Sequence, residues 1–152
     1  QNVKAIGGLY MEAADSAELS GLLEQARQRP SPNTASFCMG AAETYRVAKA
    51  AGHPVVREFY SDRDYDETGT IVFTRRMRVL DPQEVAARCV RACQTGKVKT
   101  ESGVDIDLAS HSIRLPSPPP AAHTLRTPIH SPTTDHGTRI THPPHHLAPP
   151  PT

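Results

Sequence analysis

Short apolar runs alternate with longer segments of helical composition along the first 113 residues of the chain. The apolar runs are bounded by turn residues, which is typical of strands, and they lie at residues 3–9, 35–39 and 55–60. The helical segments between them lie at residues 17–29 and 41–51. This order predicts repeated strand–helix units and a mainly parallel sheet.

The first predicted helix carries a cap signal and an apolar stripe. Asp15 can cap it, and Glu18 follows three residues later, as a capping box requires. Pro30 and Pro32 end it. The positions at helical spacing, which predict its buried face, are Leu19, Leu22, Leu23 and Ala26.

A stronger helix signal begins at Asp81, where an acidic cap precedes Pro82 and Glu84 completes a capping box. Gly96 is expected to end this helix, as Gly52 ends the second one. Its predicted buried stripe consists of Val85, Ala86, Cys89, Val90 and Cys93.

Residues 97–100 and 104–108 predict a short hairpin around residues 101–103, because apolar and acidic positions alternate in the second run. Three or four strand–helix units are visible in all. That number suits an open α/β sheet or part of a (β/α) barrel, since a complete barrel needs about 250 residues.

Composition divides the 152-residue chain after Ile113. Eleven of the fifteen prolines and six of the eight histidines follow it, but only four of the thirty-three charged residues do. Such a segment cannot bury enough apolar surface to offset its ordering entropy. We therefore expect a folded domain over residues 1–113 and a disordered Pro/His/Ser/Thr-rich tail over residues 114–152.

Charge and cysteine content narrow the class of protein. A net charge of +1 without a dense Lys/Arg block argues against nucleic acid as a partner. No apolar run approaches the roughly 20 residues of a membrane span, and the first residues do not resemble a signal peptide. Three cysteines argue against a disulfide framework, so we expect buried free thiols and a cytoplasmic location.

Two blocks carry a resemblance to a known family: VVREFYSDRDYDETGTIVFTRR at 55–76 and LDPQEVAARCVRACQTGKV at 80–98. Their order and spacing resemble the C-terminal half of the LamB/YcsF family, the lactam-utilisation proteins or A subunits of 5-oxoprolinase. VKAIGGLYMEA at 3–13 is similar to the family's Val-Lys-Pro-His-Gly-Ala-Leu-Tyr segment. The matching positions are Lys4, Gly7, Leu9, Tyr10, Arg57, Glu58, Ser61, Asp62, Arg63, Tyr65, Gly69, Arg75, Arg76, Asp81, Pro82, Gly96, Lys97 and Val98.

The resemblance covers residues 2–113 and implies both a fold and an activity. It implies a TIM-like (β/α) barrel, of which this chain would be the C-terminal half, with the site at the carboxyl ends of the strands. It also implies ATP-dependent opening of a lactam, 5-oxoproline, to glutamate. Mg²⁺ and the partner subunits B and C would take part.

The resemblance also directs attention to four candidate site residues. Glu58 is expected to act as a carboxylate base or a ligand of a metal-bound water, with Asp62 beside it. Arg63 would clamp an anion, and Lys4 would be a second cation at another strand end. The alternative is an ion-pair network of Glu58, Asp62 and Arg63 that only fixes the loop. For Lys4 alone a structural or solvated role is favoured.

Three departures from the family pattern bear on activity. Ala5-Ile6 stands where the family has Pro-His, so an expected imidazole is missing. After Ile113 the family's Cys-Val-His-Gly-Asp continuation is absent, and so is its N-terminal Asp-Leu-Asn-x-Asp segment. The chain also starts without Met, so we expect part of a longer protein and no turnover by this chain alone.

A second hypothesis is a non-enzymatic interaction protein. The proline runs of the predicted tail could bind SH3- or WW-type grooves, and its histidines could bind a metal, although a solvated tail is favoured over both. An exposed sheet edge could instead capture a partner or lead to self-association.

Overall fold

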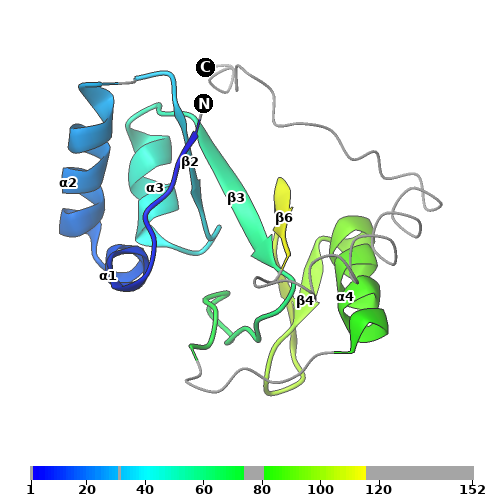
Figure 1. Cartoon of the computed structure of the whole chain (residues 1–152). Coiled ribbons are helices and arrows are strands. Elements are labelled where there is room, and N and C mark those ends of the chain that lie inside the picture. Colours follow the sequence, from blue (N-terminus) through cyan, green and yellow to red (C-terminus); the bar gives the residue numbers. More distant parts are fainter. Residues whose placement is uncertain (1, 31, 74–80, 116–152) are drawn as a thin grey trace. The chain divides into compact units, whose positions relative to one another are not determined.

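The computed structural model describes residues 2–30, 32–73 and 81–115 (Figure 1). These residues form two compact units, which meet within one strand, between Glu58 and Phe59.

A parallel sheet forms the centre of the first unit, as the sequence predicts. Its strands are β1 (Asn2–Val3), β2 (Ala35–Cys38) and the first part of β3 (Val55–Tyr60). β2 lies between the other two and pairs in parallel with both.

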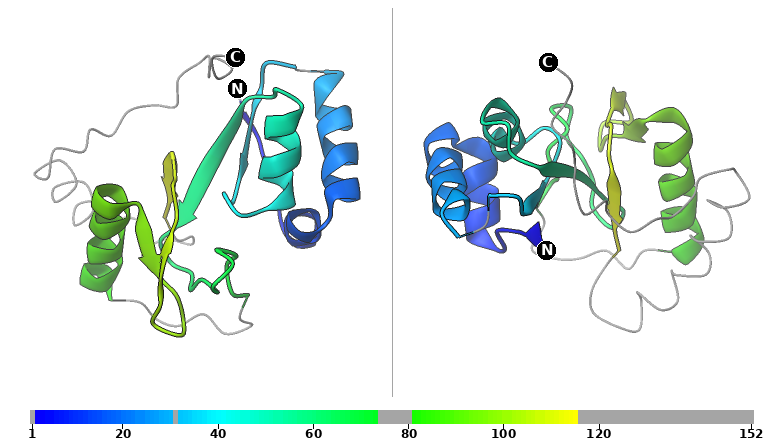
Figure 2. Two further views of the ribbon diagram at one scale, coloured as in Figure 1. Left: turned by 180° about the vertical axis from the view of Figure 1, so that it is seen from behind. Right: turned by 90° about the horizontal axis from the view of Figure 1, so that it is seen from above.

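Three helices accompany these strands: α1 (Gly8–Asp15), α2 (Ala17–Gln28) and α3 (Glu43–Ala50). They pack against one another, and α3 also contacts β2 (Figures 1 and 2). Gly52 follows α3 with a φ of 69°, which confirms the predicted helix stop.

The prediction of a strand over residues 3–9 is wrong in its length. β1 ends at Val3, and residues 8–15 form α1, which the sequence pattern did not predict. Gly7 stands at the helix start with a φ of 63°, a left-handed conformation that glycine adopts without strain. This residue reverses the backbone between the strand and α1.

The predicted cap and stripe of α2 are both wrong. Ser16, not Asp15, is the cap, and its Oγ accepts a hydrogen bond from the backbone N–H of Leu19 at 3.1 Å. Leu22 is 55% exposed, and the buried positions of the helix are Ser20, Glu24 and Arg27. The leucine periodicity misled because the surface that α2 packs against is polar.

The second unit contains the end of β3, α4 (Pro82–Thr95), β4 (Lys97–Lys99), β5 (Asp105–Asp107) and β6 (Ser112–Arg114). β4 and β5 form the predicted antiparallel hairpin, and β6 neighbours β3. α4 packs on β4 (Figure 2).

The signals read for α4 are largely confirmed. Asp81 caps the helix by accepting from the N–H of Gln83 at 3.0 Å, and Gly96 ends it in the left-handed conformation. The predicted burial of Cys93 is wrong, because its side chain is exposed and Ala92 is buried instead.

A buried tyrosine organises the second unit. Tyr65 is 1% exposed, and its ring stacks on Phe59 with centroids 5.9 Å apart. Its phenolic oxygen accepts a hydrogen bond from the backbone N–H of Tyr60 at 2.8 Å. The turn after β3 is thereby tied back to the end of that strand.

Several expectations fall outside the described residues, including Arg75, Arg76 and residues 116–152 of the predicted tail. Arg114, assigned to the tail by composition, lies in β6. Among the described helices none is long and apolar enough to cross a bilayer.

Candidate functional site

Lys4 and Glu58 form an ion pair in the first unit. Lys4 directly follows β1, and Glu58 lies in the second half of β3. Lys4 Nζ donates to Glu58 Oε2. The side chains are 20% and 10% exposed, respectively, so water screens this pair only partly. Two of the four predicted site residues, 54 positions apart in sequence, are therefore brought together.

The direction of Glu58 follows from the strand period. Arg57, the preceding residue of β3, lies with its guanidinium 5.4 Å from the ring centre of Tyr45 on α3. Successive side chains of a strand point to opposite faces. Glu58 therefore points to the face of the sheet away from α3.

Two further side chains lie near the ion pair. The ring of Tyr10 on α1 faces Lys4, with Nζ 5.2 Å from the ring centre. Cys38 ends β2 and is 1% exposed. Burial raises the pKa of the Cys38 thiol to about 12, and the negative charge of Glu58 adds to this effect. Cys38 therefore stays a neutral thiol near neutral pH.

The other two predicted site residues, Asp62 and Arg63, lie in the second unit, in the turn after β3. The guanidinium of Arg63 lies over the ring of Phe73, 5.5 Å from its centre. Arg88 of α4 donates to the backbone carbonyl of Arg63 at 2.5 Å and lies 3.6 Å from Asp64. α4 thus fixes the backbone of this turn.

Ile6 occupies the position of the histidine that the family resemblance leads one to expect. Its side chain is 78% exposed. An isoleucine can neither donate nor accept a hydrogen bond, so this position contributes no proton-transfer group.

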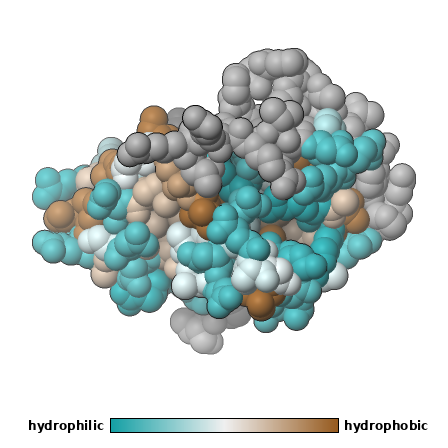
Figure 3. Space-filling view, turned by 90° about the horizontal axis from the view of Figure 1, so that it is seen from below, coloured by the Kyte–Doolittle hydropathy of each residue, from teal (hydrophilic) through white to brown (hydrophobic). Residues whose placement is uncertain are grey.

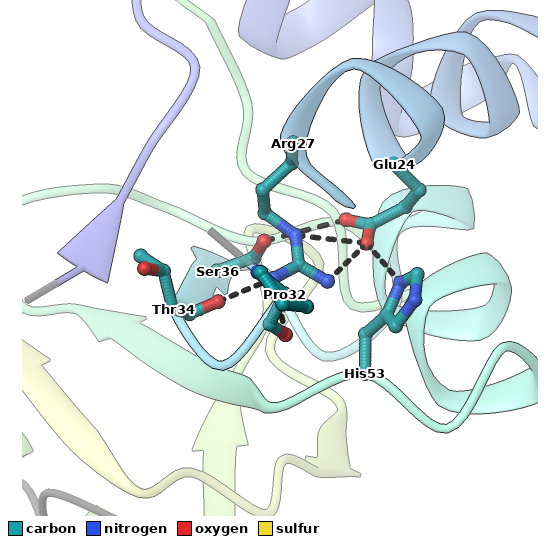
Figure 4. Close-up of polar contacts among 6 residues, drawn as sticks. All are labelled: Glu24, Arg27, Pro32, Thr34, Ser36 and His53. Carbon is teal, nitrogen blue, oxygen red and sulfur yellow. Dashed lines mark hydrogen bonds and ion pairs between the residues drawn. The ribbon is translucent and has the colours of Figure 1, made fainter. Parts of the chain in front are cut away.

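A second cluster of charged side chains lies elsewhere in the first unit, and the sequence analysis missed it (Figure 4). Glu24 Oε2 accepts from Arg27 at 3.0 and 2.8 Å and lies 2.7 Å from Nδ1 of His53. Ser36 donates to Glu24 Oε1 at 3.3 Å, and Arg27 also donates to the carbonyl of Thr34 at 2.5 Å. Ser36 lies near the start of β2 and His53 precedes β3, so this cluster joins the amino ends of the strands to α2.

Signals for these contacts were present but ambiguous. Glu24 and Arg27 have the three-residue spacing of a helical ion pair, which more often marks an exposed face. Tyr10 was noted only as a packing residue, because nothing local shows that it meets Lys4. Both contacts depend on tertiary structure.

Metal binding finds little support in the described residues alone. Carboxylates are suitable ligands for Mg²⁺, but over residues 2–30, 32–73 and 81–115 no group of three or more His, Cys, Asp or Glu side chains could hold a metal ion. Glu58 meets a cationic group instead.

Parallel strands alternating with helices, with a buried ion pair beside β1 and β3, place the chain in the α/β class. The model of the LamB/YcsF family matches residues 1–148, and the chain belongs to this family.

Similar proteins include two A subunits of 5-oxoprolinase. Over 125 residues the chain is 46% identical to the first of these subunits in Pseudomonas aeruginosa, covering 82% of this chain and 50% of that protein. It is 47% identical to the second one in Pseudomonas syringae pv. tomato, over the same length and coverage. The chain thus spans about half the length of the curated relatives it matches.

A solved structure shows the same fold. The crystal structure of the Lactam Utilization Protein from Thermus thermophilus superposes with a TM-score of 0.80. The match covers 91% of this chain and 56% of that one, at 22% sequence identity.

Proposed function

We propose that this chain provides part of the A component of a 5-oxoprolinase, acting in the cytoplasm on 5-oxoproline together with subunits B and C. The family membership and the names of the relatives support this proposal. The observation that carries it within the structure is the contact between Lys4 and Glu58, a cation and a carboxylate held beside a parallel sheet.

The reaction places clear demands on such a site. A lactam carbonyl is a poor electrophile, and transfer of the terminal phosphoryl group of ATP to its oxygen makes the carbon more reactive. Water then adds to this carbon, the ring C–N bond breaks, and glutamate, ADP and phosphate result. Cations must neutralise phosphate and the substrate carboxylate, and a carboxylate must orient or deprotonate the water.

The four candidate residues match these demands in chemical type. Glu58 is proposed to orient the attacking water, with Asp62 as a second carboxylate. Lys4 and Arg63 are proposed to bind the anionic groups of the substrates. No reaction step is assigned to Mg²⁺, because the described side chains do not form a complete site for it.

We further propose that residues 1–113 form part of a TIM-like barrel and that this part alone does not turn over substrate. The match to 56% of a related structure supports the first statement. The position of Ile6 in place of a histidine supports the second.

Two measurements test the proposed function. Purified chain incubated with 5-oxoproline, ATP and Mg²⁺ is expected to form no glutamate above a protein-free blank. Ligand-observed NMR is expected to detect 5-oxoproline binding to the wild-type chain and weaker binding to Glu58→Gln and Lys4→Met. Glutamate formation would disprove the inactivity, and identical spectra with and without protein would disprove the substrate proposal.

One observation favours the alternative of a non-enzymatic interaction protein. β1 lies at the edge of the sheet with both residues exposed. Exposed apolar side chains occur in the first unit as well, and the face in Figure 3 shows brown residues among polar ones. Light scattering over a concentration series separates the two hypotheses, because an edge that captures partners predicts a mass above that of the monomer.

A further inference from the structure

Tyr10 has a contact that packing alone does not require. Its ring is 9% exposed, and the ammonium of Lys4 lies 5.2 Å from the ring centre. A cation within about 6 Å of an aromatic face is attracted by the negative charge density of that face. Lys4 is therefore held from two directions, by the ring of Tyr10 and by the carboxylate of Glu58.

The local backbone explains how the ring reaches this position. Gly7 has a φ of 63°, and the N–H of Tyr10 donates to the Gly7 carbonyl at 3.2 Å in the first turn of α1. The chain reverses sharply between Lys4 and Tyr10, so that these two side chains face each other. No heavy atom lies within 4 Å of a Cβ built on Gly7, so conformation rather than space demands the glycine.

Burial makes the contact stronger. The side chains of Lys4 and Glu58 are 20% and 10% exposed, and Tyr10 is almost covered. Attraction between a cation and a ring grows as water is removed from both. The other ring–lysine contact of this unit, between Tyr45 and Lys49 at 5.9 Å, lies on α3, where Lys49 is exposed.

We propose that Tyr10 is a positioning residue: its ring keeps the ammonium of Lys4 in place when an anionic substrate group, a carboxylate or a phosphate, replaces Glu58 as the partner of Lys4. Without the ring, a lysine released by Glu58 would move into solvent, because its long aliphatic side chain is flexible. The substrate part of this inference rests on the proposed function, whereas the holding of Lys4 by Tyr10 does not.

Competitive acetylation with mass-spectrometric readout tests the holding of Lys4 directly, at one fixed pH and without turnover. Tyr10→Leu is expected to raise the acetylation rate of Lys4 by about threefold or more, since an apolar side chain lacks the attractive ring face. Tyr10→Phe is expected to retain the wild-type rate. Tyr45→Leu is the matched control, and the rate of exposed Lys49 is expected to change by less than about twofold in it.

A second series covers the case in which Tyr10→Leu does not fold. Phenylalanine with one, two and three fluorine atoms at position 10 keeps the ring but withdraws electron density from its face. The acetylation rate of Lys4 is expected to rise with each fluorine while that of Lys49 stays constant. Rates of Lys4 that do not change along this series would overturn the proposal, as would equal rates for Tyr10→Phe and Tyr10→Leu in folded protein.

Ligands separate this inference from the proposed function. 5-Oxoproline is expected to slow acetylation of Lys4, whereas 2-pyrrolidone, a lactam without a carboxylate, is not. Slowing by ATP alone would assign Lys4 to the phosphate rather than the carboxylate. Absence of any slowing would contradict the substrate role of Lys4, and the fluorine series would still decide whether Tyr10 holds it.

Discussion

Glu24 Oε2 lies 2.7 Å from Nδ1 of His53, and this contact joins helix α2 to the residue two positions before β3. The same oxygen accepts two hydrogen bonds from Arg27, and the other carboxylate oxygen accepts one from Ser36 of β2. One buried carboxylate thus connects a helix with the beginnings of two neighbouring strands. The contact between Lys4 and Glu58 lies further along the same strands, so the frame and the candidate site use separate ion pairs.

Replacing Glu24 by glutamine is expected to destabilise the first unit. The amide carries no charge, so Arg27, which is 7% exposed, would remain as an uncompensated buried cation. Loss of one partner of a buried ion pair costs about 3–5 kcal/mol. Urea unfolding followed by circular dichroism measures the change in the free energy of unfolding.

Glu43→Gln is the control for this prediction. Glu43 pairs with Arg46 at 2.5 Å on the surface of α3, with the same three-residue spacing as Glu24 and Arg27. Exposed pairs of this kind contribute little. Equal losses for the two variants would show that the Glu24 cluster is not an anchor of the fold.

Lys4 and Glu58 are expected to be energetically coupled. Lys4→Met and Glu58→Gln each leave one member of a partly buried pair without its counterion, whereas the double variant removes both charges. The double variant should therefore be more stable than the sum of the single losses indicates, with a coupling of about 1–3 kcal/mol. A double-mutant cycle from urea unfolding measures it, and additive losses would contradict the contact.

The hydroxyl of Tyr65 should contribute to the stability of the second unit. Tyr65→Phe keeps the stacking on Phe59 but removes the acceptor of the Tyr60 N–H. A buried N–H without an acceptor costs about 1–3 kcal/mol. Thermal unfolding is expected to show this loss, and a smaller one for Tyr45→Phe on the half-buried ring of α3. An unchanged midpoint for Tyr65→Phe would argue against the hydrogen bond.

Thiol reactivity should distinguish the three cysteines. Cys93 is exposed, whereas Cys38 and Cys89 are buried. Burial raises the pKa of the Cys89 thiol to about 12, as it does for Cys38, so neither forms the reactive thiolate near pH 8. Ellman's reagent is expected to modify one thiol in the folded chain and three in denaturant. Loss of the fast reaction in Cys93→Ser would confirm the assignment.

Alkaline pH should destabilise the fold through the same thiols. The pKa of Cys38 and of Cys89 is raised from 9.0 to about 12, and burial also raises the pKa of Tyr65. The folded state therefore keeps protons that the unfolded state releases above about pH 9. This contribution to stability is complete below pH 9 and is lost as pH rises towards 12. The variant Cys38→Ala/Cys89→Ala should show a flatter fall of unfolding free energy between pH 9 and 11 than wild type; parallel curves would contradict the buried thiols.

Much of the fold was predictable because its signals are local. Val55–Tyr60 is a dense apolar run, and Asp81-Pro82 with Gly96 marks both ends of α4. Each of these signals acts within a few residues, through backbone preferences and capping hydrogen bonds. The stripe of α2 was not predictable in this way, because the polar partners Ser36 and His53 decide which face is buried.

The candidate site was predicted only as a set of residue types. Family resemblance singled out Glu58 and Lys4 separately, and neither strand pattern shows that they touch. Their contact depends on β1 and β3 flanking β2, and the role inferred for Tyr10 depends on the left-handed Gly7. Contacts across a sheet and through a glycine reversal leave no periodic trace in the sequence.

β3 carries two neighbouring residues with opposite duties. Glu58 pairs with a lysine in one unit, and Phe59, fully buried, stacks on a tyrosine in the other. Deleting or inserting a single residue early in this strand would exchange the directions of both side chains at once, placing a carboxylate against an aromatic ring and a phenyl group against an ammonium. Insertions and deletions should therefore be tolerated poorly between Val55 and Phe59, whereas point substitutions there can be accepted one at a time.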